Sequence, residues 1–278
     1  MCRLIALTTE GTTEDALSRF MDAFTKSAHR DVYLLKITNG KFSSHDDGWG
    51  LAAAGLVRNT PSVAQHRSIE PIFHEYSIRL INLFIRKLVS YKPLYVIMHA
   101  RKSSASEPYG LEYTHPFMML SNSGVAWFAH NGGAKKSILA EKMGVFPWIR
   151  VDSELLGYYV MNKVLSCGEE DKDLTRCVVD AYIESKEYIT EGSALNTVLL
   201  ILWKNKPRLF ISHWVKEPLS DLLREYYAII AYRGKNTTFA GSISIRDYLP
   251  TEFAGDVWIL EPGIYELTPE DVFKLADL

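Results

Sequence analysis

The chain has 278 residues, of which 47% are hydrophobic and 23% charged, and its formal net charge is −2. This composition is that of an ordinary globular protein with a sizeable core, and it excludes collagen-like, disordered and coiled-coil classes. The near-neutral charge and the lack of a Lys/Arg stripe argue against a nucleic-acid partner, and no apolar run is long enough to predict a membrane span. We recognise no secretory signal and therefore expect a cytosolic location.

Hydrophobic periodicity predicts helices at four places in the chain. The first is expected to begin at Thr12–Asp15, because this polar stretch precedes an apolar face with a helical period. The residues of that face are Ala16, Leu17, Phe20, Met21 and Phe24. Further helices are expected from about Pro71 to Ser90, after Asp152 and after Asp171.

Short runs rich in β-branched and aromatic residues predict strands between and after these helices. They cover residues 49–57, 94–99, 125–129, 195–203, 209–214, 226–232 and 257–260. The runs form hairpin-like groups with helices between the groups, an order that favours a layered α+β fold over a doubly wound parallel sheet. Gly and Asn/Asp clusters separate the runs without a repeat or a low-complexity linker, so one domain is the simplest interpretation.

Common signatures of cofactors, metals and disulfides are missing from the sequence. It has no glycine-rich phosphate loop of the Rossmann or P-loop type, and we expect no cofactor. The cysteines, Cys2, Cys167 and Cys177, form neither an even set nor a CxxC pair. We therefore interpret Cys167 and Cys177 as helix-packing thiols rather than as metal ligands or bridge partners.

Cys2 directly follows the initiator Met1. Removal of Met1 by an aminopeptidase would leave a thiol and a free α-amine on the same first residue. Because an α-amine titrates near ~8 and a thiol near ~8.5, the amine can serve as the base for the thiol without a histidine. The alternative is that Cys2 is a small apolar residue at the start of a buried strand that contains Leu4–Leu7.

Polar clusters accompany two of the predicted strands. In His45–Gly50, glycines on either side of Trp49 would let a backbone or a ligand approach closely, although Asp-Gly is also a common turn. In His99–Ser104, Arg101 stands at a strand end and suits bidentate capture of a carboxylate. A surface arginine in a solvated loop is the alternative there.

Two further clusters follow the strand 125–129. In His130–Gly133, an asparagine amide and the N–H of the next glycine can form an oxyanion hole at the end of a rigid strand. A hairpin turn is the alternative, because Asn-Gly is a strong hairpin signal. Asp152 opens a predicted helix, where it can cap the helix, bind a substrate ammonium, or do both.

The order of these clusters resembles the class II glutamine amidotransferase domains of the N-terminal-nucleophile hydrolase superfamily. An N-terminal cysteine is followed by DGWG, HxR, HNG and an aspartate at a helix start. The resemblance is closest to the stand-alone type that begins Met-Cys-Arg. It implies an α+β four-layer αββα sandwich, formed as a single domain by residues 2–278 after removal of Met1.

The resemblance also implies a reaction and its residues. In that family the N-terminal cysteine attacks the side-chain amide of glutamine, giving a γ-glutamyl thioester and ammonia, and water then releases glutamate. The matching positions are Cys2 for the nucleophile, Asn131 and Gly132 for the oxyanion donors, Arg101 for the α-carboxylate, Ser104 for a nearby hydroxyl and Asp152 for the α-ammonium. His115, in a His-Pro element, is given only a supporting role.

Several alternatives stay open at this point. The substrate is glutamine or another γ-glutamyl amide, and the chain acts either with a separate synthase subunit that accepts ammonia or as a self-sufficient hydrolase. An inactive relative that binds an amino acid is a second possibility. A metal-dependent hydrolase is a third, although the HExxH and HxxEH spacings are absent. Its candidate ligands are His45, Asp46, Asp47, His99, His115 and His130.

Overall fold

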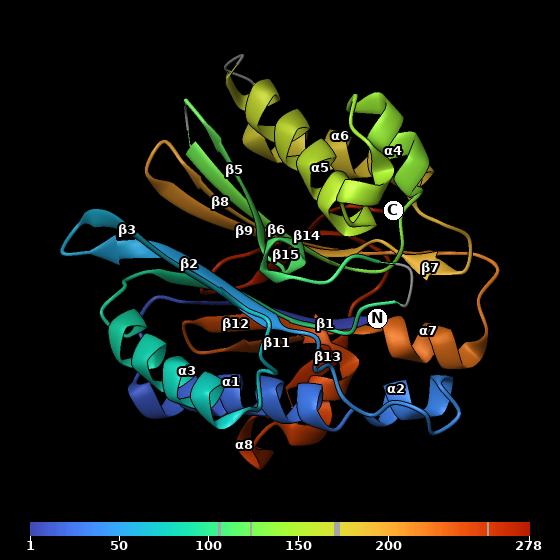
Figure 1. Cartoon of the computed structure of the whole chain (residues 1–278). Helices are drawn as coiled ribbons and strands as arrows, with labels where there is room; N and C mark the ends of the chain where they lie inside the picture. The colour runs from blue at the N-terminus through green and yellow to red at the C-terminus, as the bar shows by residue number, and fades with distance from the viewer. Residues whose placement is uncertain (105–106, 123, 170–172, 255) are drawn as a thin grey trace.

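Two β-sheets are stacked face to face, and helices cover the outer face of each (Figure 1). The computed structural model describes residues 1–104, 107–122, 124–169, 173–254 and 256–278. Within these residues the larger sheet has seven strands, in the order β13-β11-β12-β1-β4-β2-β3. Its strands are β1 (Cys2–Thr9), β2 (Trp49–Val57), β3 (Thr60–Ser68), β4 (Leu94–Arg101), β11 (Ile229–Gly234), β12 (Thr237–Ser242) and β13 (Val257–Ile259).

The second sheet has six strands in the described chain, in the order β15-β14-β9-β8-β6-β5. Its strands are β5 (Phe117–Ser121), β6 (Gly124–Asn131), β8 (Asn196–Trp203), β9 (Lys206–His213), β14 (Gly263–Leu267) and β15 (Val272–Ala276). A short ladder pairs β7 (Ser193–Ala194) with β10 (Val215–Lys216). Every paired strand in both sheets runs antiparallel to its neighbour.

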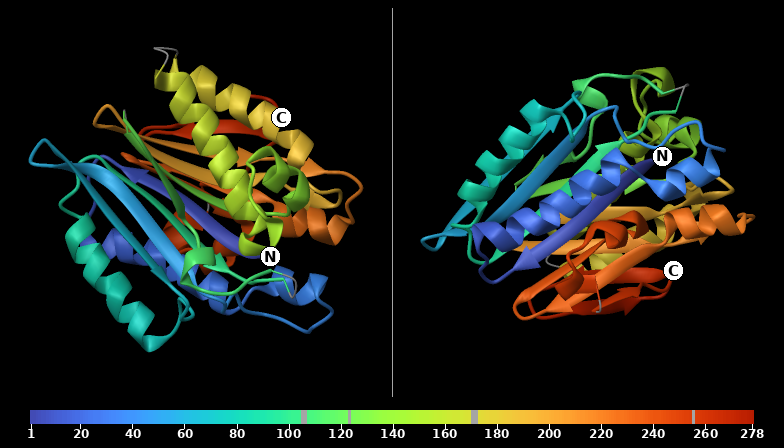
Figure 2. Two further views of the ribbon diagram at one scale, coloured as in Figure 1. Left: turned by 45° about the horizontal axis from the view of Figure 1, so that its top comes forward. Right: turned by 90° about the horizontal axis from the view of Figure 1, so that it is seen from below.

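The helices form the two outer layers, as Figure 2 shows from two further directions. On the side of the larger sheet lie α1 (Glu14–His29), α2 (Val32–Ile37), α3 (Glu75–Leu88), α7 (Asp221–Tyr227) and α8 (Thr251–Ala254). On the side of the second sheet lie α4 (Lys136–Lys142), α5 (Asp152–Glu169) and α6 (Leu174–Ser185). Short 3₁₀ helices are η1 (Leu111–Tyr113), η2 (Pro147–Ile149), η3 (Lys186–Tyr188) and η4 (Ile243–Tyr248).

Three hydrophobic cores fill the spaces between the four layers, and β1 illustrates how one strand serves two of them. Because successive side chains of a strand point to opposite faces, Leu4 and Ala6 enter the core between the sheets. Ile5 and Leu7 enter the core under α1 and α3. The third core lies between the second sheet and the α5–α6 layer. The predicted four-layer αββα sandwich is therefore confirmed.

One detail of the sequence interpretation is corrected by the structure. The strand predicted over residues 226–232 begins only at Ile229, because Tyr226 and Tyr227 end helix α7. The Ser220 side chain caps that helix by accepting the N–H of Leu223, a local signal that outweighs the β-propensity of the two tyrosines. The helix expected after Asp171 is α6, which begins at Leu174.

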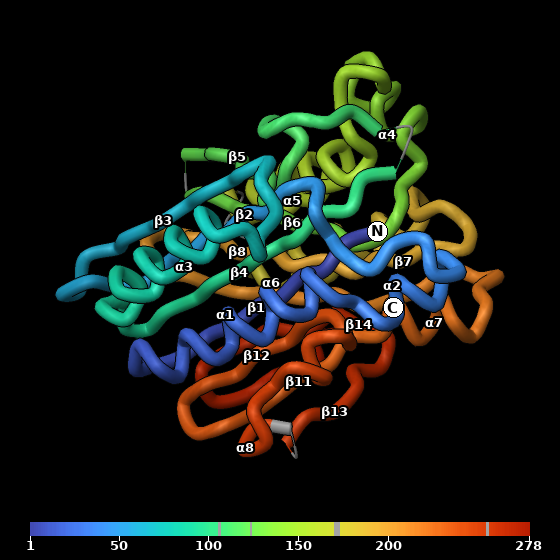
Figure 3. Tube along the Cα trace, turned by 60° about the horizontal axis from the view of Figure 1, so that its bottom comes forward, coloured from blue at the N-terminus to red at the C-terminus, as the bar shows by residue number. Residues whose placement is uncertain are grey.

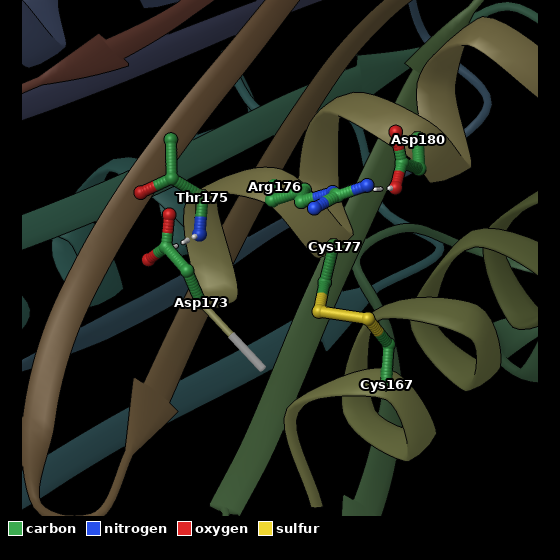
Figure 4. The surroundings of a disulfide bond; sticks show 6 residues. All are labelled: Cys167, Asp173, Thr175, Arg176, Cys177 and Asp180. Carbon is green, nitrogen blue, oxygen red and sulfur yellow. Dashed lines mark hydrogen bonds and ion pairs between the residues drawn. A yellow bond between two sulfur atoms is a disulfide. The ribbon is translucent and has the colours of Figure 1, made fainter. Parts of the chain in front are cut away.

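Cys167 and Cys177 form a disulfide bond, so their interpretation as unbridged packing thiols was wrong. Figure 4 shows the bond joining α5 to α6. The two helices pack against each other and bring the Cα atoms to 5.8 Å, within the range that a disulfide requires. The pairing was not visible in the sequence, because it depends on how two separate helices pack.

Candidate functional site

The polar clusters converge at one end of β1, where strand ends of both sheets meet. Cys2 opens β1 and is paired across the ladder with Arg101 at the end of β4. Asn131 closes β6 in the facing sheet. A cavity of about 220 Å³ opens here. Its lining includes five residues predicted from the sequence, which are Cys2, Arg101, Ser104, Gly132 and Asp152.

Cys2 is buried, and its backbone nitrogen points at the sixth predicted residue. The Cys2 N–H donates to Oδ1 of Asn131 at 3.0 Å. Met1 continues the ladder: its ammonium donates to the Lys102 carbonyl and its carbonyl accepts the Lys102 N–H, both at 2.9 Å. The atom that becomes the α-amine when Met1 is removed is thus already held by a side-chain acceptor.

The electrostatic surroundings of the Cys2 thiol favour the thiolate. Burial raises the pKa of the thiol, but nearby positive charge and hydrogen-bond donors act in the opposite direction. The ammonium of Met1 and the imidazole of His99 contribute most to this lowering, and the resulting pKa is about 6. With Met1 in place, a thiol with this pKa is largely ionised at neutral pH, and the thiolate is the form that acts as a nucleophile.

Asn131 and Gly132 place donors beside Cys2. Asn131 is buried, and its Nδ2 has no hydrogen-bond partner among the described residues. A side chain at Gly132 would collide with the carbonyl oxygen of Ala194, so only glycine fits this close approach. The segment continues toward α4 instead of turning back, so the hairpin alternative was wrong. An unpaired buried amide donor beside a thiol is what stabilisation of an oxyanion requires.

The DGWG segment holds the end of β4. The Asp47 N–H donates to the Arg101 carbonyl at 3.0 Å, and the Arg101 N–H donates to the Gly48 carbonyl at 2.8 Å. Asp47 Oδ2 also accepts the N–H of Ser103 at 2.8 Å. These bonds fix the backbone on both sides of the arginine. The motif therefore acts on the site through Arg101, and does not itself line the cavity in the described structure.

Arg101 is buried at 4% exposure, so the alternative of a solvated surface arginine was wrong. Its Nη2 donates to Ser103 Oγ at 3.1 Å and to the Pro108 carbonyl at 2.8 Å. Its Nη1 is buried, and no acceptor for it is found in the part of the chain that the structure describes. The guanidinium is thus oriented by two bonds and retains a free donor at a cavity wall, which suits it to a carboxylate ligand.

Asp152 faces the same cavity from the N-terminus of α5. Its Oδ2 accepts the N–H of Ala134 at 2.8 Å, and its Oδ1 accepts the N–H of Ser153 at 2.7 Å. The carboxylate therefore fixes the chain that leaves Gly132 and Gly133, and its remaining lone pairs can accept from a ligand ammonium. Ser104 is exposed at the rim, where its carbonyl accepts the N–H of Glu107 at 3.1 Å.

His115, which the sequence resemblance gave only a supporting role, is part of the cavity lining. It is buried at 3% exposure, and its ring lies 3.9 Å from the ring of His99. His99 Nε2–H donates to the His130 carbonyl at 3.2 Å. Both ring nitrogens of His115 lack a partner within the described ranges, and burial keeps its pKa well below the usual range. A neutral imidazole with unused donor and acceptor atoms thus faces the ligand space.

Gly50 explains how His115 reaches this position. A side chain at Gly50 would collide with the carbonyl oxygen of His115 and with the ring of Pro116. Gly50 is the second glycine of DGWG and is paired with His99 in the ladder between β2 and β4. Because it has no side chain, the His-Pro segment can lie directly on β2 at this point. The His-Pro element was the available sequence signal for His115, but it did not reveal this contact.

The remaining cavity walls come from residues that the sequence did not single out. Glu107 lines the cavity and forms an ion pair of 2.8 Å with Lys136, and burial raises the pKa of the Glu107 carboxyl. Ser193 Oγ accepts the N–H of Gly133 at 2.6 Å. No group of three His, Cys, Asp or Glu side chains within the described chain could hold a metal ion. One of the candidate ligands, His45, is instead bonded to Asp31.

A comparison with protein-family models identifies the family of the chain. The model of class II glutamine amidotransferases matches residues 1–200, which is more than half of the chain. The chain belongs to the class II glutamine amidotransferases. The resemblance predicted from the sequence is thus confirmed for the family. A comparison with curated proteins gives no match.

One solved structure supports the fold of this chain. The chain is similar to the allosteric regulatory enzyme of purine biosynthesis, with a TM-score of 0.56 and 13% identity over 98% of this chain and 49% of that one. It therefore spans about half the length of that relative. A predicted glutamine amidotransferase from Pseudomonas aeruginosa PA01 matches with a TM-score of 0.45 and 15% identity, over 98% of this chain and 96% of that one. Among the helices of the described residues, none has the length and apolarity needed to cross a lipid bilayer.

Proposed function

We propose that this class II glutamine amidotransferase hydrolyses the side-chain amide of glutamine or of a related γ-glutamyl amide, with Cys2 as its N-terminal nucleophile. The observation that carries the proposal is the bond of 3.0 Å from the Cys2 nitrogen to Asn131 Oδ1. It leaves Asn131 Nδ2 without another partner among the described residues, beside the cavity that also contains Arg101 and Asp152. These charges match a free amino acid, which presents a carboxylate and an ammonium beside its side-chain amide.

The proposed reaction begins after Met1 has been removed. The α-amine of Cys2 takes the thiol proton, and Sγ attacks the amide carbon of the substrate. The Asn131 amide and the Gly132 N–H stabilise the resulting oxyanion. The carbon–nitrogen bond then breaks, the leaving nitrogen takes the proton from the ammonium, and ammonia departs. Water, deprotonated by the same amine, attacks the γ-glutamyl thioester and releases glutamate and the thiol.

The substrate roles follow from the charges at the walls. We assign the α-carboxylate of the substrate to the free Nη1 donor of Arg101, and the α-ammonium to Asp152. Ser104 lies at the rim of the same cavity and is proposed to contact the bound amino acid there. A substrate held at both ends presents its side-chain amide to the thiol in one orientation, which lowers the entropic cost of the attack.

Three measurements test the proposal. Intact mass of the purified protein shows whether Met1 is removed. Cys2→Ala should abolish glutamate release from glutamine, and an electrophile that mimics glutamine should add mass to the N-terminal peptide alone. A control is the double substitution Cys167→Ala and Cys177→Ala, which removes the disulfide of the α5–α6 layer without leaving a free thiol, and it should retain turnover.

The outcomes separate the open alternatives. Stabilisation by glutamine without turnover would identify an inactive amino-acid-binding relative. Met1 retained in the cellular protein would leave the base in a peptide bond and would contradict the proposed mechanism. Release of free ammonia at the same rate as glutamate would indicate a self-sufficient hydrolase. Turnover that rises only with a second protein would indicate a separate synthase subunit.

We also infer that residues 2–278 form a single domain, because late strands complete both sheets. Strand β12 pairs with β1, and β14 pairs with β9. The cytosolic location stays a prediction. The Cys167–Cys177 disulfide argues against that location, because disulfides persist mainly in oxidising compartments.

A further inference from the structure

The first residues of β1 extend beyond the end of their neighbour β12. Pairing between the two strands starts at Ile5, opposite Gly241, so Cys2 and Leu4 have no backbone partner on that side in the described structure. Side chains take the place of the missing strand. Asn131 accepts the Cys2 N–H, Ser242 Oγ accepts the Leu4 N–H at 3.1 Å, and the Tyr226 hydroxyl donates to the Cys2 carbonyl at 3.2 Å.

Removal of Met1 weakens the attachment of Cys2 on the opposite side. Met1 and Lys102 exchange two hydrogen bonds, so they form a hydrogen-bonded pair of the antiparallel ladder. Because such pairs alternate, Cys2 opposite Arg101 makes no ladder bonds, and the next hydrogen-bonded pair is Arg3 with Ala100. When Met1 leaves, both bonds to Lys102 are lost, and the main chain of Cys2 is held by Asn131 and Tyr226.

Tyr226 is itself held by the residue that follows the nucleophile. The guanidinium of Arg3 lies 4.0 Å from the centre of the Tyr226 ring, and Arg3 Nη1 donates to the Tyr226 carbonyl at 3.0 Å. Both side chains are completely buried. Successive side chains of a strand point to opposite faces, so Arg3 lies on the helix side of the sheet while Cys2 faces the cavity.

A buried carboxylate balances the charge of Arg3. Asp31 forms an ion pair with Arg3 Nε, and its Oδ1 caps α2 by accepting the N–H groups of Tyr33 and Leu34. His45 Nε2–H donates to Asp31 Oδ2 at 2.7 Å. The three side chains of Arg3, Asp31 and His45 have 0% exposure. A charged group buried this deeply is tolerated only when it is paired, so the cluster forms one interdependent unit.

This unit ties β1 to two helices. Asp31 precedes α2 and Tyr226 lies in α7, and these helices are side by side beneath the start of β1 (Figure 3). Burial and the neighbouring Asp31 raise the pKa of the Tyr226 phenol well above its usual range, although Arg3 acts in the opposite direction. The hydroxyl therefore stays protonated and can donate at any pH at which the protein works.

We propose that Tyr226, braced by Arg3, Asp31 and His45, is a positioning residue that holds the carbonyl of the terminal cysteine once Met1 is gone. The inference rests on the proposed function, because it concerns the geometry of the Cys2 nucleophile. With the carbonyl fixed by Tyr226 and the nitrogen fixed by Asn131, rotation of the first residue is restrained. The α-amine and the thiol then keep the mutual orientation that proton transfer between them requires.

The test is Tyr226→Phe, which keeps the ring on Arg3 and removes only the hydroxyl. The matched control is Tyr182→Phe, because Tyr182 is also fully buried and its hydroxyl has one hydrogen bond, from Thr197 Oγ1 at 2.6 Å, in the core under α6. We expect kcat for glutamate release to fall about tenfold in Tyr226→Phe with KM unchanged, the effect of one hydrogen bond. The control should lose comparable stability and keep both constants.

A second measurement follows the ionisation of the Cys2 thiol and does not depend on turnover. The rate at which iodoacetamide alkylates Cys2 is followed from pH 5 to pH 9 by mass spectrometry. In Tyr226→Phe we expect the midpoint of this profile to move to higher pH, because the ammonium is no longer held beside the thiolate, whereas in Tyr182→Phe it should stay in place. Arg3→Lys keeps the charge for Asp31 but loses the bond to the Tyr226 carbonyl, and should shift the profile in the same direction.

The outcomes distinguish this inference from the proposed function. If the wild-type protein with Met1 removed releases no glutamate, the proposed function fails, and the alkylation profiles still decide whether Tyr226 positions the thiol. If the wild type is active and Tyr226→Phe matches Tyr182→Phe in kcat and in alkylation profile, the positioning role is wrong. Should Tyr226→Phe fail to fold, an unshifted profile in Arg3→Lys would contradict the inference equally.

Discussion

Asn131 has two atoms with different proposed tasks, and two substitutions separate them. Oδ1 accepts the N–H of Cys2 at 3.0 Å, while Nδ2 is buried without a partner among the residues described. Asn131→Asp keeps the size of the side chain and the acceptor, but replaces the amide donor with a carboxylate oxygen. Asn131→Ala removes both the donor and the acceptor without adding a charge. Both variants should therefore lose the oxyanion donor, and only the aspartate should also place a negative charge beside the α-amine.

The magnitudes follow from these two effects. Loss of one oxyanion donor costs about 3 kcal/mol, so kcat should fall about 150-fold in Asn131→Ala. In Asn131→Asp the new carboxylate lies near the amine, and an opposite charge at that distance raises an amine pKa by about 1–3 units. Less free base then remains at pH 7, which multiplies the loss in kcat to about 10³-fold or more. KM should stay within about threefold in both, because Arg101 and Asp152 are unchanged.

The assay is glutamate release by protein whose removal of Met1 has been verified by intact mass, measured from pH 5 to pH 9.5. In Asn131→Asp the acidic limb of the kcat profile should move up by at least about one pH unit, whereas in Asn131→Ala it should stay where the wild type has it. Equal pH profiles in the two variants would show that Oδ1 does not contact the working amine. A kcat within threefold of wild type in both would refute the oxyanion role.

Three further predictions concern binding and stability. Arg101→Lys should raise KM for glutamine about tenfold or more with a small change in kcat, because lysine lacks the forked donor; a loss confined to kcat would contradict the carboxylate role. Burial lowers the pKa of His213 from 6.5 to about 4, so the unfolded chain binds its proton first as pH falls, and stability present at pH 7 is lost toward pH 4. Between pH 7 and pH 5, the free energy of unfolding measured in urea should therefore fall by about 2 kcal/mol less in His213→Gln than in the wild type. An equal fall in the two proteins would refute this prediction. Reduction of the Cys167–Cys177 bond should lower the free energy of unfolding by about 3 kcal/mol, the value for a short loop, and no change with reductant would count against a formed bridge in solution.

Much of the architecture was predictable because it depends on local patterns. The apolar face of α1 and the cap at Thr13 are properties of consecutive residues, and the structure has the helix from Glu14 to His29. The runs at 49–57 and 94–99 were predicted from β-branched and apolar residues and are the interior strands β2 and β4. Strand β3 was not predicted, because it is largely polar, and its pairing with β2 is not visible in a local hydrophobic pattern.

Some residues of the candidate site were also predictable from local patterns. Arg101 and Asn131 each stand at the end of an apolar run, and a residue that closes a buried strand is presented at the edge of a sheet. The sequence could thus indicate which side chains are offered by rigid elements. It could not indicate that the two edges belong to different sheets that meet over Cys2.

Only the tertiary structure decided which distant residues act together. The register that places Cys2 opposite Arg101 joins positions far apart in the chain, and it arises from pairing between whole strands. The same holds for the Tyr226 hydroxyl on the Cys2 carbonyl and for the stacking of His115 on His99. Periodicity and local motifs report how a residue sits within its own element. By itself the sequence therefore determined the family, the layers and the residues offered at strand ends, while packing between elements decided how the nucleophile is held.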